Sequence, residues 1–86
     1  MQINEANMRA ALVGLSAKLQ SAESRLNGRN AIYHKIRHLE LQEHCETLLE
    51  DVNRECGNTE KQIDDINKLE SSVGTLLARL ENEDAA

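Results

Sequence analysis

The sequence contains no proline, no phenylalanine and no tryptophan, and Tyr33 is its only tyrosine. All-β domains depend on aromatic and β-branched strands and on turns that contain proline, so these absences argue against an all-β fold. The chain is instead rich in leucine, alanine, glutamate, glutamine, lysine and arginine, which all have high helix propensity. The composition therefore predicts an all-α protein that is helical over nearly its whole length.

Long apolar runs are missing as well. No segment approaches the ~20 apolar residues that a membrane-spanning helix needs. The first residues, MQINEANMRAALVGL, lack the basic and apolar regions of a secretory signal. The chain has two cysteines, and without such a signal we expect both to be reduced thiols. We therefore expect an intracellular, cytoplasmic protein that does not bind a membrane, with a nuclear location as the open alternative.

Basic charge is scarce over most of the chain. The net charge is -5, of which residues 1–30 contribute +2 and residues 31–86 contribute -7. Binding to phosphates needs a dense basic face, so nucleic acid is not an expected partner. The two oppositely charged segments would instead attract each other, either within one chain or between antiparallel neighbours.

Apolar residues recur at heptad spacing, which is typical of helices that pack in coiled coils and bundles. Within residues 32–56 the line of apolar residues changes its heptad phase near Glu40. Such a slip changes the supercoiling of a helix or rotates the helix toward a second neighbour. The first segment carries Met8, Leu12, Leu15, Leu19, Ala22 and Leu26. The second carries Ile32, Ile36 and Leu39, followed by Leu41, Cys45, Leu48, Val52 and Cys56. The third carries Ile63, Ile66, Leu69, Val73, Leu76, Leu77 and Leu80.

Two glycine-containing segments interrupt this pattern. In CGNTEKQ, residues 56–62, the glycine suits a helix C-terminus, and Thr59 with Gln62 forms a capping box, so we predict a turn at 56–59. A second turn is predicted at 27–30, where Asn30 would cap the next helix.

With both turns, residues 1–86 form a single domain of three helices, and the acidic residues 82–86 fray. The predicted helices are 2–27, 30–56 and 60–83. The heptad register passes through 27–30 unchanged, which weakens the case for that turn. If neither turn is real, the chain is a continuous rod of about 120 Å.

Histidines and cysteines gather in residues 34–56, which raises the alternative of a metal or redox site. His34 and His38 are four residues apart, a spacing by which one helix face presents two imidazoles to zinc. No C-x-x-C pair and no second histidine pair completes a tetrahedral site beside them, so a sensor that uses His34, His38, Cys45 and Cys56 is a weak hypothesis. We therefore expect these side chains to lie at the helix seam, and a metal or redox contact between chains is the weaker alternative.

No residues form a catalytic constellation. Carboxylates fall off the apolar stripes, no nucleophile stands beside an oriented base, and no glycine-rich loop follows a strand. We therefore expect no enzymatic activity, no cofactor and no small-molecule substrate.

The pattern favours a coiled-coil structural or interaction subunit that assembles through helix–helix contacts, either with itself or with helices of a larger complex. The alternative is a monomeric three-helix bundle that acts as a binding module and receives a partner helix. We expect the contacts to be carried by Leu12, Leu15, Leu19, Leu26, Ile36, Leu48, Val52, Ile63, Ile66, Val73, Leu77 and Leu80.

Overall fold

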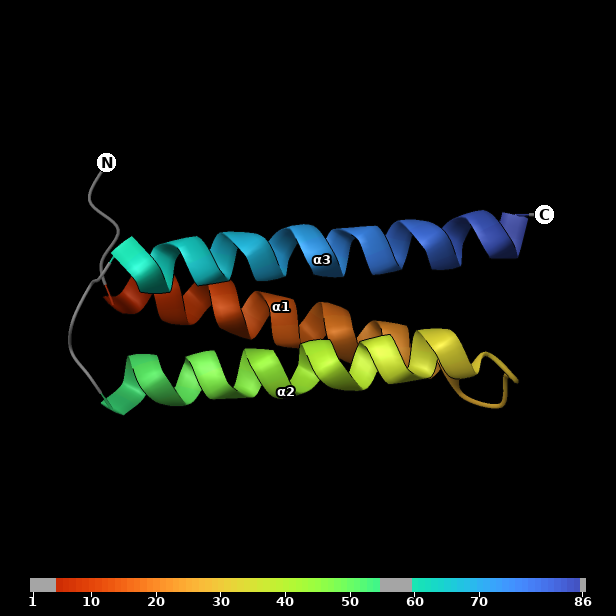
Figure 1. Ribbon diagram of the computed structural model, residues 1–86, viewed down its shortest axis with the longest axis horizontal. Helices are drawn as coiled ribbons and strands as arrows, with labels where there is room; N and C mark the ends of the chain where they lie inside the picture. Colours follow the sequence, from red (N-terminus) through yellow and green to blue (C-terminus); the bar gives the residue numbers. More distant parts are fainter. Residues whose placement is uncertain (1–4, 55–59, 86) are drawn as a thin grey trace.

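The computed structural model describes residues 5–54 and 60–85, and in this part of the chain it contains three α-helices and no strand. These are α1 (Glu5–Leu26), α2 (Ile32–Arg54) and α3 (Glu60–Ala85). They lie side by side in an up-down-up bundle, in which α1 and α3 run in one direction and α2 runs in the other (Figure 1). The predicted all-α fold with three antiparallel helices is confirmed.

The bundle measures 43 × 23 × 17 Å, and each helix packs against the other two. At about 1.5 Å per residue, each helix runs along most of the long axis. These dimensions exclude the alternative of a single extended rod. Among the described residues, no helix combines the length and the apolar character that crossing a membrane requires.

The connection from α1 to α2 turns at Asn27 and Gly28. Gly28 has a φ of 81°, a left-handed conformation that glycine adopts without the steric cost other residues meet. The Arg29 amide donates to the carbonyl of Leu26 at 3.1 Å, which closes the end of α1. The Lys35 amide donates to the carbonyl of Ala31, so Ala31 takes the N-cap position that the sequence had assigned to Asn30.

The helix ends differ from the predicted ones by a few residues. α2 begins at Ile32, two residues after its predicted start. α3 continues to Ala85, so the segment expected to fray is helical as far as that residue. The turn predicted at 56–59 lies outside the described residues.

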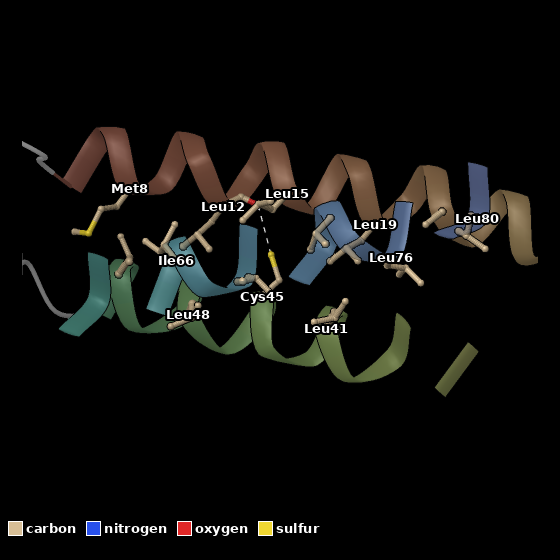
Figure 2. Packing of buried hydrophobic residues seen from close by; sticks show 14 of the residues in the cluster. Met8, Leu12, Leu15, Leu19, Leu41, Cys45, Leu48, Ile66, Leu76 and Leu80 are labelled. Atoms are coloured by element: carbon tan, nitrogen blue, oxygen red, sulfur yellow. Dashed lines mark hydrogen bonds between the residues drawn. The ribbon is translucent and has the colours of Figure 1, made fainter. Parts of the chain in front are cut away.

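The core is a single apolar cluster along the axis of the bundle, to which all three helices contribute (Figure 2). Heptad spacing places one stripe of each helix inward, as the sequence predicts for α1 and α3. The buried apolar residues are Met8, Leu12, Leu15, Leu19, Ala22, Leu26, Leu41, Cys45, Leu48, Val52, Ile66, Leu69, Val73, Leu76 and Leu80.

Candidate functional site

The residues predicted to carry helix–helix contacts mostly pack within the chain itself. Ile63 and Leu77 are partly buried against the core, whereas Ile36 is 55% exposed. The other nine are buried in the core, namely Leu12, Leu15, Leu19, Leu26, Leu48, Val52, Ile66, Val73 and Leu80. Of the twelve, Ile36 is therefore the residue most available to another molecule.

The sequence predicts that Ile36 packs against another helix, but the residue that α2 buries in this region is His38. Its side chain is only 4% exposed, and it is the one polar or charged residue buried in the described part of the chain. The imidazole Nε2 lies 2.7 Å from the carbonyl oxygen of Leu19 on α1. Because a carbonyl oxygen only accepts, Nε2 carries the proton of this bond. A buried polar group is thus given a partner on a neighbouring helix.

A second bond of the same kind lies one heptad away. The Cys45 thiol of α2 donates to the carbonyl oxygen of Leu12 on α1 at 3.5 Å (Figure 2). His38 and Cys45 are seven residues apart, and so are Leu19 and Leu12, so the two bonds repeat one register between antiparallel helices. They tie one stripe of α2 to the backbone of α1.

This stripe explains why α2 does not follow the predicted change of phase. His38, Leu41, Cys45, Leu48 and Val52 form one continuous buried face at heptad spacing. A straight helix that buries the apolar residues of its second half must bury whatever lies on the same face in its first half. That face carries histidine, and the isoleucines lie on the opposite side.

The consequence is an apolar surface on the first half of α2. Ile32, Tyr33, Ile36 and Leu39, which we term the outer face of α2, are each more than half exposed. Ile32, Ile36 and Leu39 follow i, i+4, i+7 spacing and so form one stripe. Leaving such side chains in water forgoes about 1.5–3 kcal/mol each relative to full burial. Grouped exposure of this kind marks interaction sites in soluble proteins.

Beside the outer face lies a groove of about 640 Å³ between the first half of α2 and the second half of α3. Its α2 wall is bulky and its α3 wall consists mainly of small hydroxyl side chains, with the buried Leu76 reaching it from the core. The lining residues are Tyr33, His34, Ile36, Arg37, Glu40, Ser71, Ser72, Thr75, Leu76 and Arg79. Two smaller hollows, of about 210 and 320 Å³, lie between other helix pairs.

His34 joins the two walls of the groove. Its Nε2 lies 2.8 Å from Oε1 of Glu83 on α3, and the ring of Tyr33 meets the imidazole edge-on at 5.9 Å. The side chain of Glu83 is 55% exposed, so this pair adds little stability. The contact between His34 and Glu83 marks where the first turn of α2 lies beside the last turns of α3.

Basic side chains border the apolar surface. Arg37 stands on the α2 wall of the groove and is 3.7 Å from Glu40, beyond the length of a good hydrogen bond. Arg79 stands on the α3 wall and forms no ion pair or side-chain hydrogen bond with any described residue. Lys35 lies on the other side of the outer face, in the hollow between α1 and α2. It forms no ion pair with another described residue.

The candidate metal ligands are separated by the fold. His38 and Cys45 bind carbonyls of α1, His34 binds Glu83, and Cys56 lies outside the described residues. Within residues 5–54 and 60–85, no group of three or more histidine, cysteine, aspartate or glutamate side chains is placed to hold a metal ion. A metal or redox contact between chains stays a prediction.

Burial raises the pKa of the Cys45 thiol, and the neighbouring Glu46 carboxylate raises it further. A neutral thiol is a weak nucleophile and a poor metal ligand. It can still donate, which is the role it has toward Leu12. In this structure Cys45 packs in the core as a small buried side chain that donates to α1.

The outer face and the groove were only partly detectable in the sequence. The phase slip near Glu40 signalled that the two halves of α2 differ, but it did not reveal which half would turn outward. Ser71, Thr75 and Arg79 carried no signal, because their role depends on lying opposite residues that are about 40 positions earlier in the chain.

Comparison of the chain with protein-family models, with curated proteins and with solved structures gives no match. Its function is therefore inferred from its own residues.

Proposed function

We propose that this protein is a non-enzymatic helix-binding module, which receives an amphipathic helix of another protein in the groove between α2 and α3 and on the outer face of α2. The observation that carries the proposal is the exposure of Ile32, Tyr33, Ile36 and Leu39 beside a groove of about 640 Å³. A partner helix would cover these apolar side chains and complete a four-helix arrangement.

The dimensions of the groove suit a short helical contact. Its lining runs from Tyr33 to Glu40 on α2 and from Ser71 to Arg79 on α3. At about 1.5 Å per residue, each wall is ~10–12 Å long, which is about two helical turns. An incoming helix would therefore present anchors at i, i+3 or i+4, and i+7, which is the pattern of helix-in-groove recognition.

The other sequence-based hypothesis, a coiled-coil subunit, has less support. A coiled-coil assembly needs apolar seams that remain available to other chains. Here the seam residues of α1 and α3 already pack against each other and against α2. Among the described residues, the outer face of α2 is the apolar stripe that stays exposed, and it favours a docked helix over an extended coil.

A displayed library of amphipathic helices, each about 20 residues long with a fixed leucine stripe, tests the proposal. We expect the wild-type protein to enrich binders, and Ile36→Glu to abolish the enrichment because a charge would stand inside the contact. Val13→Glu is the matched control, since Val13 is equally exposed at 55% but lies on α1. Equal enrichment by wild type and Ile36→Glu would contradict the proposal.

A further inference from the structure

We infer that the helix received by this groove carries acidic side chains on both sides of its apolar stripe, and that Arg37 and Arg79 select it. The inference rests on the proposed function and deepens it by naming the chemistry of the partner. Two guanidinium groups stand on opposite walls of the groove, beside the exposed apolar side chains of α2.

Neither arginine forms a close, hydrogen-bonded ion pair with another described residue. Arg37 approaches Glu40 only to 3.7 Å, and Arg79 has no charged partner among the described residues. Elsewhere on the surface, basic side chains are paired more closely, as in Lys68 with Asp64 at 3.0 Å and Arg54 with Asp51 at 2.9 Å. The groove thus presents two guanidinium groups that a carboxylate of a partner can reach, and arginine binds carboxylates with two parallel hydrogen bonds.

The local charge contrasts with that of the whole chain. From Ile32 to Gln42, α2 carries Lys35 and Arg37 against Glu40, whereas from Glu43 to Arg54 it carries four acidic residues and one basic residue. The apolar outer face therefore coincides with the basic half of α2, on a chain whose net charge is -5. Basic residues outnumber the one acidic residue, Glu40, in this half of α2, and a mainly basic rim around an apolar contact favours partners of the opposite sign.

The same charges argue against a second copy of this chain as the occupant. Lys35 and Arg37 immediately flank Ile36 in the sequence. A twofold contact centred on the outer face would bring both groups, and Arg79 beside them, toward the same groups of the other copy. Like charges across an interface disfavour the pairing, so the partner is a different chain with carboxylates at these positions.

The wall formed by α3 favours a helix over a bulkier domain. Ser71, Ser72 and Thr75 project little from α3, and Thr75 already donates its hydroxyl to the Ser71 carbonyl at 3.0 Å. Small side chains at a contact allow helix axes to approach toward the short end of the usual 8–10 Å range. An incoming helix can then reach Ile36 and Leu76 while its flanks meet the two arginines.

The test uses the displayed helix library with the positions beside the leucine stripe drawn from glutamate, lysine and glutamine. We expect wild-type protein to enrich glutamate at those positions on both sides of the stripe. The double variant Arg37→Glu/Arg79→Glu should bind the selected helix about tenfold more weakly and should enrich lysine instead. Both arginines are exposed, so the variant is expected to remain folded, which its helical circular dichroism checks.

The matched control is Arg54→Glu/Lys61→Glu, which makes the same change in net charge on exposed residues outside the groove. It should enrich the same helices as the wild type. Enrichment without preference for charge, or with preference for lysine, would overturn the acidic partner and leave the proposed function standing. If wild-type protein enriched helices no more than the Ile36→Glu variant does, the proposed function itself would be overturned. A wild-type dimer that Ile36→Glu dissociates would assign the groove to a second copy and would also overturn the inference.

Discussion

His38 of α2 and Leu19 of α1 are joined by a buried hydrogen bond of 2.7 Å, from the imidazole Nε2 to a main-chain carbonyl oxygen. The bond satisfies the imidazole N–H within the apolar core. Burying an imidazole without a hydrogen-bond partner would cost free energy of folding. With the bond from Cys45 to Leu12, it fastens α2 to α1 in the orientation that places Leu41, Leu48 and Val52 in the core. The apolar outer face, and hence the proposed function, follows from that orientation.

Substitution of His38 tests the contribution of this bond. His38→Ala removes the donor and leaves a cavity, so we expect a loss of about 2–3 kcal/mol in the free energy of unfolding. His38→Gln keeps an amide N–H of similar reach and should lose about 1 kcal/mol or less. Urea denaturation measures both values. Equal losses would mean that the donor contributes nothing to stability.

The core of α1 can be tested with two adjacent residues. Leu12 is fully buried (0% exposed), and Leu12→Ala should lower the free energy of unfolding by about 2–5 kcal/mol. Its neighbour Val13 is exposed, and Val13→Ala should change the same quantity by no more than about 0.5 kcal/mol. Similar denaturation midpoints for the two variants would contradict the assigned face of α1.

Two glycines should respond to alanine with opposite signs. Gly14 lies within α1 and a methyl group there would meet no atom within 4 Å, so Gly14→Ala should stabilise the protein by about 0.5–1 kcal/mol. Gly28 has a left-handed φ of 81°, so Gly28→Ala should destabilise it by about 1 kcal/mol or more. Thermal melting of both variants checks the signs. A stabilising Gly28→Ala would exclude the described turn.

The raised pKa of Cys45 predicts a loss of stability in alkali. An unfolded thiol ionises near pH ~8.5, whereas the folded one holds its proton to higher pH. Between these values the folded state binds more protons, so the free energy of unfolding falls as the pH rises. The contribution of Cys45 to the free energy of unfolding is fully present below the pKa of the unfolded thiol. It is lost as the pH rises through the pKa of the folded thiol.

Cys45→Ser keeps a donor for the Leu12 carbonyl but does not ionise in this range. Urea denaturation from neutral pH to pH ~10 should therefore show a shallower alkaline decline for the serine variant than for the wild type. Parallel profiles would mean that Cys45 ionises equally in both states. Other groups that titrate here are common to both proteins and cancel in the comparison.

Much of the fold was predictable because heptad spacing maps directly onto a helix face. Met8 to Leu26 and Ile66 to Leu80 lie inward as their spacing requires. The sequence left the first half of α2 ambiguous, because it offered both Ile36 and His38 to the helix seam. Ile36 has the more apolar side chain, and His38 lies in the heptad register of the buried Leu41. His38 turns inward because it shares the face of the buried Leu41 and Leu48, and the Leu19 carbonyl on α1 supplies a partner that no pattern within α2 contains. The groove was hidden for a similar reason, because its walls meet only in the folded bundle.

The most direct test of the account is the solvent exposure of methyl groups, measured by nuclear magnetic resonance with a soluble paramagnetic probe. In wild-type protein we expect strong broadening of the methyl signals of Ile32, Ile36 and Leu39, and little broadening of those of Leu41 and Leu48. The reverse pattern would mean that α2 is rotated, with its isoleucines in the core. It would remove the outer face, and the proposed binding site would be lost with it.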